Sequence, residues 1–363
     1  MRLLGQCRPM ANKVAEKIAG EWILVLSLIG LVGTSLYLKR FPAYDRTDME
    51  VVYILMVFLV IVRGMERSNL LHVVAAAFRK GRGLSVRLIL LTSILSMFVT
   101  NDVAVLTVVP MTLALDVDGA EMLVILETLA ANAASALSPI GNPQNIFIYF
   151  HYRIHAWAFI RSIFPFFLVS LSLIFLIAWR QKIVVPVTRD AGKARLDGKA
   201  CGYLVLFCCF ILAVLKIVPL WTGMLAVIYA ALFDRKSLAI DWLLLLTFMA
   251  FFGFTDNLTK IVRLTIDNPL EAFIYPALGS QVLSNVPSTL FFADLTNNWK
   301  ALLWGVSIGG MGNLVGSLAS LIAYRLYKAK SRRQKRFLIR FHVYGYGMYL
   351  MGIVTYLLIH LSL

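Results

Sequence analysis

The sequence predicts an all-α polytopic membrane protein, an inverted-topology repeat with about nine transmembrane helices, two re-entrant hairpins and two broken helices. Of the 363 residues, 60% are hydrophobic and 15% are charged, whereas an average soluble domain is about 25% charged. Many apolar runs are long enough to cross a bilayer. Two short polar interruptions, Thr100-Asn101-Asp102 and Ser284-Asn285-Val286, lie inside strongly apolar stretches, one in each half of the chain.

The apolar segments define the expected elements in chain order. They are 22–38, 51–63, 86–115, 121–150, 157–179, 201–218, 220–233, 239–254, 272–293, 300–324 and 342–361. The segments 86–115 and 272–293 carry the polar interruptions in their middle, so we expect each to enter and leave the membrane on one side. The remaining segments are expected to cross it once.

The distribution of basic residues tests this topology. Lys and Arg concentrate in four segments: 1–20, 63–87, 180–199 and 325–340. Basic residues in short loops beside membrane spans mark the cytoplasmic side. With two re-entrant hairpins, all four segments face the cytoplasm, so the N-terminus is expected in the cytoplasm and the C-terminus outside a bacterial inner membrane. The first hairpin then opens to the cytoplasm and the second to the outside.

These elements divide the chain into six expected parts. They are N-terminal scaffold spans at 1–85, a first repeat core at 86–179, a cytoplasmic linker at 180–200, second-half scaffold spans at 201–271, a second repeat core at 272–328, and a basic loop with the last span at 329–363.

The formal net charge of +16 raises the question of nucleic-acid binding. Because the basic residues flank membrane spans, they are expected to contact anionic lipid headgroups instead. The cysteines show no metal-ligand spacing and no disulfide framework; they are Cys7, Cys201, Cys208 and Cys209. No nucleotide-binding, nucleophile–base or zinc motif is present. We therefore expect no cofactor apart from Na⁺ or H⁺ as a coupling ion, and no enzymatic activity.

Each polar interruption is followed by a glycine-centred break. The first is Ser138-Pro-Ile-Gly-Asn-Pro-Gln-Asn145 and the second is Gly309-Gly-Met-Gly-Asn-Leu-Val-Gly-Ser317. The stretch from Ser138 to Tyr149 aligns without a gap with the stretch from Asn313 to Tyr324, sharing glycine and tyrosine at equal positions. Matched breaks in the two halves of a membrane protein are the best sequence indication of a transporter's binding site.

A helix that is broken at membrane depth exposes carbonyl groups at one end and amide groups at the other. Carbonyls suit a cation, and helix N-termini suit an anion. The candidate substrate- and ion-binding residues are Thr100, Asn101, Asp102, Ser138, Gly141, Asn142, Asn145, Ser284, Asn285, Ser288, Thr289, Gly312, Asn313, Gly316 and Ser317. A Na⁺ site is expected at Asn101, Asp102 and Asn285. The alternative is that the small residues only pack helices together.

Two acidic residues are candidates for coupling a proton or an ion. Asp102 lies beside the first interruption, and Glu127 lies two turns into the span that leads to the first break. Charged residues within membrane segments are rare and usually functional. Glu127 has a second interpretation, in which it lies near enough to the cytoplasmic end to reach water. Val286 replaces Asp102 at the second interruption, so the site is expected to be asymmetric.

At these motifs the chain resembles the ion transporter superfamily. That group includes arsenical pump permeases, NhaD-type antiporters, divalent-anion symporters and citrate-transporter-like anion permeases, and the closest resemblance is to the YbiR-type inner-membrane branch. The residues that carry it are Thr100–Ala104, Leu137–Asn145, Ser280–Thr289 and Gly316–Ala319. The resemblance implies a homodimer with scaffold and transport domains, a site at the hairpin tips and broken helices, and elevator-like transport.

This chain departs from one pattern within the superfamily at both tips. Dicarboxylate symporters carry Ser-Asn-Thr at both tips, whereas this chain has Thr100-Asn101-Asp102 and Ser284-Asn285-Val286. Asp102 would repel a carboxylate substrate unless it is protonated or paired with a cation. The expected function is secondary active transport of a small inorganic or organic anion coupled to Na⁺ or H⁺, and the alternative is cation/proton antiport. An intramembrane enzyme and a passive channel are both disfavoured.

Overall fold

The computed structural model describes residues 22–77, 83–114, 119–180, 196–261, 265–331 and 333–360. Within them the chain is helical, without strands. The helices are α2 (Trp22–Leu38), α3 (Arg46–Arg67), α4 (Leu70–Ala77), α5 (Leu84–Val99), α6 (Asn101–Ala114), α7 (Ala120–Ser135), α8 (Pro143–His151), α9 (Ala156–Arg180), α10 (Ala200–Val214), η1 (Leu220–Gly223), α11 (Met224–Phe233), η2 (Arg235–Leu238), α12 (Trp242–Ile261), α13 (Pro269–Leu283), α14 (Asn285–Ala293), α15 (Trp299–Gly309), α16 (Leu318–Lys330) and α17 (Gln334–His360).

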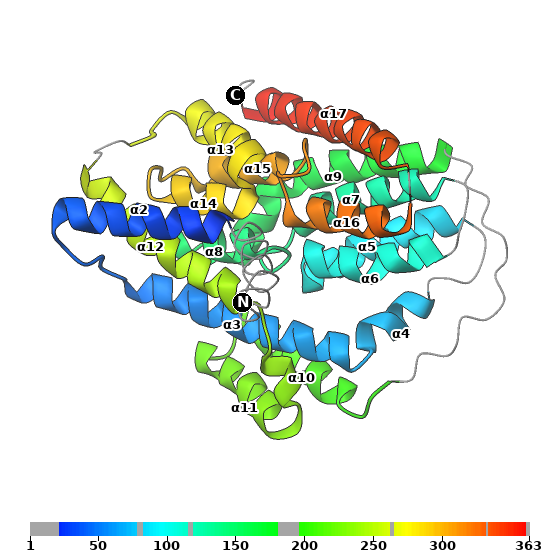
Figure 1. Cartoon of the computed structure of the whole chain (residues 1–363), viewed down its shortest axis with the longest axis horizontal. Coiled ribbons are helices and arrows are strands. Elements are labelled where there is room, and N and C mark those ends of the chain that lie inside the picture. The colour runs from blue at the N-terminus through cyan, green and yellow to red at the C-terminus, as the bar shows by residue number, and fades with distance from the viewer. Residues whose placement is uncertain are drawn as a thin grey trace, which may run out of the picture.

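The two segments with polar interruptions form helical hairpins. Helices α5 and α6 pack on each other and are joined at Thr100, and α13 and α14 pack on each other and are joined at Ser284. The hairpins enter the molecule from opposite ends, and their tips meet near its centre (Figure 1). Each hairpin also contains a proline, Pro110 in α6 and Pro276 in α13.

The two glycine-centred segments break helices, as the sequence predicts. Helix α7 ends at Ser135 and α8 begins at Pro143, so the break contains residues 136–142. A proline at the first helical position starts α8, because it fixes a helical backbone angle and lacks only an N–H that would have no helical partner there. In the second half, the break between α15 and α16 contains residues 310–317.

The two hairpins pack on the broken helices of both halves of the chain. The first arm of each hairpin packs on the broken helix of its own half, α5 on α7 and α13 on α15. The second arm packs on both halves, so that α6 contacts α7 and α16, and α14 contacts α15 and α8. Each tip is therefore held between half-helices of both repeats, which places residues from the two halves of the chain at one centre.

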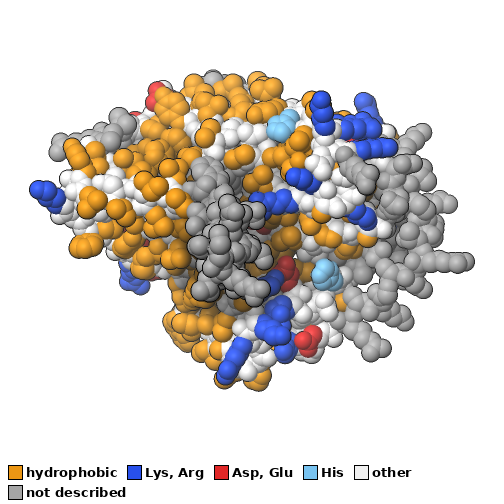
Figure 2. All heavy atoms as spheres, in the orientation of Figure 1, with side chains coloured by type: hydrophobic (Ala, Val, Ile, Leu, Met, Phe, Trp, Pro, Cys, Tyr) orange, Lys and Arg blue, Asp and Glu red, His pale blue; other side chains and the backbone are white. Residues whose placement is uncertain are grey.

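The remaining helices surround this core. Helix α2 packs along α12, and α3 contacts α8, α10, α11 and α12. Among the described residues, three helices are long and apolar enough to cross a membrane alone: α9, α17 and the stretch Arg235–Ile261 that contains α12. Apolar side chains cover much of the surface that Figure 2 shows. The exposed apolar side chains of the protein include Ile29 and Leu36, at 65% and 73% exposure. The prediction of an all-α polytopic membrane protein is confirmed.

Two predicted loops are wrong. The segment 63–87 was expected to be a loop, but residues 63–67 continue α3 and residues 70–77 form α4. The basic segment 325–340 is almost entirely helical, because α16 continues to Lys330 and α17 begins at Gln334. Lys and Arg have high helix propensity, and their long side chains reach water from a helix end. Basic composition therefore did not locate the helix ends.

Candidate functional site

Both hairpin tips contain a residue with strained backbone angles. Thr100 has φ 84° and ψ 150°, and Ser284 has φ 75° and ψ 159°. This region is occupied almost only by glycine, and other residues adopt it at a cost of about 1–3 kcal/mol where the surroundings impose it. The two tips therefore share the same unusual turn, although their sequences agree only in the asparagine that follows.

Each tip is bound to the break of its own half by the same backbone hydrogen bond. The N–H of Asn101 donates to the carbonyl of Gly141 at 3.2 Å, and the N–H of Asn285 donates to the carbonyl of Gly316 at 3.0 Å. A Cβ atom on Gly141 would lie 2.3 Å from the carbonyl oxygen of Ser135, so this position requires glycine. The sequence alignment of Gly141 with Gly316 thus corresponds to equal positions in the structure.

Asn132, which the sequence analysis did not select, lies at the centre of the site. Its Oδ1 accepts hydrogen bonds from Asn101 Nδ2 at 2.9 Å and from Ser317 Oγ at 2.9 Å. Its Nδ2 donates to the carbonyl of Gly310 at 3.0 Å and to Ser320 Oγ at 3.2 Å. The side chain of Asn132 therefore connects the first tip, the first broken helix and the second break. The sequence did carry a signal for Asn132, because an asparagine within the apolar run 121–150 is unusual.

Amide side chains hold the carbonyl groups that the breaks leave without helical partners. Asn145 Nδ2 donates to the carbonyls of Ser135 at 3.0 Å and Ser138 at 2.9 Å. In the second half, Gln281 Nε2 donates to the carbonyl of Gly309 at 2.7 Å, and Gln281 Oε1 accepts from the N–H of Asn313 at 3.0 Å. Asn145 was a predicted site residue, whereas Gln281 was not.

Asp102 lies at the N-terminal end of α16. The backbone N–H of Ala319, in the first turn of that helix, donates a hydrogen bond to its carboxylate. The other oxygen, Oδ1, is buried and has no hydrogen-bond partner. A carboxylate at this place is stabilised by the positive end of the helix dipole. Val286 occupies the equivalent position at the second tip, so only one of the two tips carries a charge there.

Further buried acceptor oxygens without a donor lie at the start of α8. Gln144 is 2% exposed and Asn145 is fully buried, and Gln144 Oε1 and Asn145 Oδ1 have no hydrogen-bond partner. At the tips, Asn101 is 2%, Asn285 is 4% and Ser284 is 9% exposed, whereas Asp102 and Val286 are half-buried. Unpaired buried acceptors are rare in proteins, and amide oxygens of this kind can accept from a hydrogen-bond donor of a ligand or coordinate a cation.

Glu127 is fully buried between the first hairpin and the first broken helix. Thr112 Oγ1, on α6, donates to its Oε1 at 2.5 Å, while Oε2 has no partner. The interpretation in which Glu127 reaches water at the cytoplasmic end is therefore wrong. Asp116 and Asp118, which follow α6 in the sequence, lie outside the described residues.

Several predicted site residues serve the packing of the second hairpin. Ser288 Oγ donates to the carbonyl of Pro276 at 2.9 Å, and Thr289 Oγ1 donates to the carbonyl of Asn285 at 2.7 Å. Gly312 has φ 81°, and a Cβ there would lie 2.3 Å from Gln281 Oε1. These residues shape the break and the hairpin. Asn142 begins α8 as its N-cap residue without a side-chain capping bond.

No cluster of three or more His, Cys, Asp or Glu side chains that could hold a metal ion occurs within the described ranges. A Na⁺ ion at the predicted position would therefore depend mainly on carbonyl oxygens. Asn101 is less suited to this than expected, because its Oδ1 accepts from the N–H of Asp102 and its Nδ2 donates to Asn132 and Ser317. Asp102 Oδ1 has no hydrogen-bond partner among the described residues, whereas Asn285 Oδ1 accepts from Ser284 Oγ at 3.4 Å.

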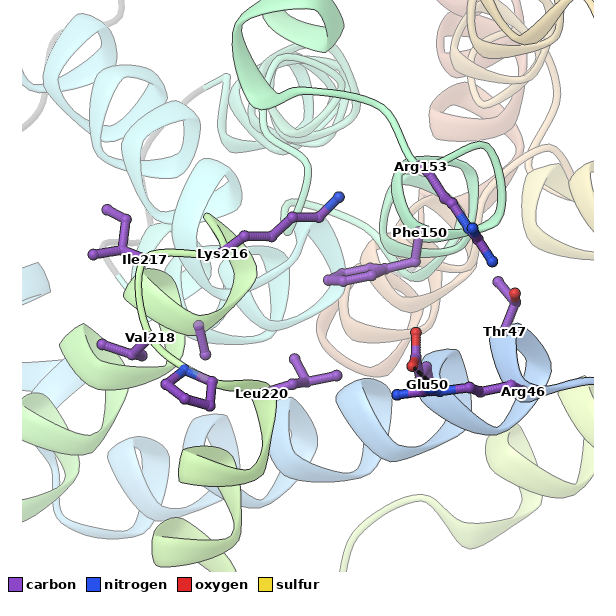
Figure 3. Close-up of a pocket in the computed structure, with 11 residues that line it drawn as sticks. Arg46, Thr47, Glu50, Phe150, Arg153, Lys216, Ile217, Val218 and Leu220 are labelled. Atoms are coloured by element: carbon purple, nitrogen blue, oxygen red, sulfur yellow. Dashed lines mark hydrogen bonds and ion pairs between the residues drawn. The ribbon is translucent and has the colours of Figure 1, made fainter.

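A cavity of about 650 Å³ lies at the other end of α8, between α3 and the α10–η1 connection. Figure 3 shows Arg153 and Lys216 on one side of it and Arg46 and Glu50, from α3, on the other. Arg46 and Glu50 form an ion pair at 2.9 Å. Helix α8 has nine residues, so this cavity is about 13 Å from the tips along the helix axis. It is distinct from the centre at which the predicted residues meet.

Comparisons with known proteins agree with this architecture. The sequence model of the citrate transporter family matches residues 14–309. The chain is 33% identical over 377 residues to the inner membrane protein YbiR of Escherichia coli, covering 96% of this chain and 98% of that protein. It is 31% identical over 323 residues to an uncharacterized transporter of Methanocaldococcus jannaschii, covering 85% and 89% respectively.

Proposed function

The chain belongs to the citrate transporter family, and on that premise we propose that it moves a small anion across the inner membrane with Na⁺ or H⁺ as the coupling ion. The anion is an inorganic oxyanion or a carboxylate. The observation that carries the proposal is the matched pair of tips. Asn101 and Asn285 each bond to a glycine carbonyl of a broken helix, at 3.2 and 3.0 Å, and each follows a residue in a strained turn.

The asymmetry between the tips supports separate places for the anion and the coupling ion. Asp102 occupies the N-terminus of α16, so the dipole of that half-helix already has a negative partner. Helix α14 packs on α8 as α6 packs on α16, but the tip of α14 presents Val286 instead of a carboxylate. The N-terminus of α8 therefore retains its attraction for an anion, and Asp102 Oδ1 is placed for a cation or a proton.

The proposed transport cycle is alternating access of the elevator kind. The hairpins and broken helices form a core in which Asn101, Ser284 and Asn285 are at most 9% exposed, whereas Asp102 is half-buried. Movement of this core against α2, α3, α10, α11 and α12 would open it to either side. The homodimer that the family resemblance implies stays a prediction.

The proposal is tested in liposomes that contain the purified protein and a trapped pH-sensitive dye. Na⁺ gradients are imposed with and without a panel of oxyanions and carboxylates, and protein-free liposomes serve as the control. Proton or Na⁺ movement that requires one particular anion supports the proposal and identifies the substrate. Ion movement that is independent of every anion contradicts it in favour of exchange.

Cation/proton antiport is the second candidate function. Glu127 favours it, because the one hydrogen bond to this fully buried carboxyl group among the described residues comes from Thr112 to Oε1, and Oε2 has no partner there. A carboxyl group without a counter-charge in such surroundings can be neutralised by a proton. In the liposome experiment, antiport predicts dye signals with Na⁺ alone, and these signals should disappear in Glu127→Gln.

A further inference from the structure

A basic cavity lies where the first hairpin, both broken helices and α17 come together. Its volume is about 480 Å³, and it is lined by Leu113, Gly119, Ala120, Glu121, Tyr327, Lys330, Ser331, Arg333, Arg336 and Arg340. It is separate from the tips, since Leu113 lies at the far end of α6 from Asn101. Lys and Arg side chains gather where α17 begins, at the upper right of Figure 2.

The described lining carries four basic side chains and one carboxylate. Arg336 Nε and Arg340 Nη1 lie 3.6 and 3.3 Å from Glu121 Oε1. That oxygen nevertheless has no hydrogen-bond partner, so the guanidinium N–H groups near it are not directed at it. The connection at residues 115–118, which contains two aspartates, lies outside the described residues.

Among the described lining residues, the other groups do not neutralise this positive charge. Tyr327 Oη donates to Glu121 Oε2 at 3.3 Å, which fixes the carboxylate at the wall of the cavity. Lys330 Nζ donates to the carbonyl of Leu113, a contact that satisfies the end of α6 but does not neutralise the ammonium. The guanidinium of Arg333 has no hydrogen-bond or ion-pair partner within the described part of the chain.

We propose that this cavity binds a phosphate group. Guanidinium groups bind phosphate through paired N–H donors, and three of them line one cavity together with an ammonium. The phosphate belongs either to the headgroup of an anionic lipid, since basic pockets between membrane helices on the cytoplasmic side bind such headgroups, or to a free phosphate compound. Residues of α6, α7, α16 and α17 line the cavity. A bound phosphate group would therefore contact the ends of helices that carry the transport site.

The test measures binding, not transport, on the full chain purified in detergent. The melting temperature is followed during titration with short-chain phosphatidylglycerol, with short-chain phosphatidylcholine, and with inorganic phosphate against chloride at equal ionic strength. Arg333→Gln is the first variant, because the unpaired side chain is not expected to support the fold. Arg333→Gln/Arg340→Gln is the second. Arg325→Gln and Lys335→Gln are matched controls, since both residues are basic neighbours that do not line the cavity.

We expect phosphatidylglycerol to raise the melting temperature of the wild type and of both controls. The apparent affinity should fall about fivefold for each cavity arginine removed. Glu121→Gln should bind more tightly, because it removes the one carboxylate in the described lining. Stabilisation by inorganic phosphate with the same dependence on Arg333 identifies a free phosphate as the occupant. Equal responses of the cavity variants and the controls, or no response to any phosphate probe, overturn the proposal.

Discussion

Asn101 Nδ2 donates a hydrogen bond to Asn132 Oδ1 over 2.9 Å, between the tip of the first hairpin and the first broken helix. Both side chains are nearly fully buried. Through Ser317 and the carbonyl of Gly310, the same amide of Asn132 also reaches the second break. The two halves of the chain therefore meet through one asparagine side chain, and several testable consequences follow from this arrangement.

Asn132→Ala should destabilise the protein and uncouple the halves. Four hydrogen bonds end on this side chain, and each buried partner left unpaired costs about 1–3 kcal/mol. A double-mutant cycle of Asn132→Ala with Asn101→Ala, measured by thermal unfolding in detergent, should give a coupling energy of about 0.5–3 kcal/mol. Additive effects of the two substitutions would show that the hydrogen bond does not link the tip to α7.

Ser284→Gly should raise the melting temperature. Glycine adopts φ 75° without strain, and the hydroxyl of Ser284 makes only a long bond of 3.4 Å to Asn285 Oδ1. Relief of the strained turn should stabilise the fold by about 1 kcal/mol. The matched control is Ser288→Gly in α14, which lies in a helix and should lower the melting temperature. A decrease for both variants would mean that the tip geometry is not strained.

Asp102→Asn should preserve the fold and abolish ion-coupled transport. Asparagine can still accept the hydrogen bond from the N–H of Ala319, but it can neither carry a negative charge nor release a proton. Asp102→Ala should in addition lose about 1 kcal/mol of stability, because it removes an acceptor at a helix N-terminus. Transport driven by a Na⁺ or H⁺ gradient is the measurement, and full coupled activity of Asp102→Asn would exclude Asp102 as the coupling residue.

Acid should weaken the scaffold through Asp234, which lies between α11 and η2. Burial opposes its charge, but the hydrogen bond from Ser237 and the charges of Arg67 and Lys199 outweigh burial and hold the pKa of Asp234 below its ordinary value. A depressed folded pKa stabilises the fold fully above the unfolded pKa of about 3.9. This stabilisation is lost as the pH falls through the folded pKa.

Melting temperatures of the wild type and Asp234→Asn between pH 3 and pH 6 measure this contribution. The wild type should be the more stable protein at the upper end of the range, and the difference should shrink as the pH falls below about 4. A constant difference across the range would mean that the ion pair of Asp234 with Arg67, at 3.3 Å, does not contribute.

The sequence could predict the hairpins and breaks because polar residues and glycines interrupt apolar runs there. The prediction of tips at Thr100 and Ser284 needed only the position of the interruptions. The sequence could not predict that Asn101 Nδ2 donates to Asn132, or that the side chain of Gln281 bonds to the second break, because both are contacts between segments distant in the sequence. Ser288 and Thr289 looked like ligands, but their hydroxyls bond to carbonyls of their own hairpin.

We propose that the substrate binds where the two tips meet, and a substitution at Asn285 tests this proposal most directly. The measurement is the apparent KM for ion-driven anion uptake in liposomes by the wild type, Asn285→Ala and Asn257→Ala. Asn257 is a similarly buried asparagine of α12, and its Nδ2 donates to Ser35 Oγ, not to a tip or a break. We predict a KM at least about fivefold higher for Asn285→Ala, because a buried polar contact to the substrate is worth about 1–3 kcal/mol, and an unchanged KM for Asn257→Ala. A folded Asn285→Ala variant with wild-type KM would contradict the account.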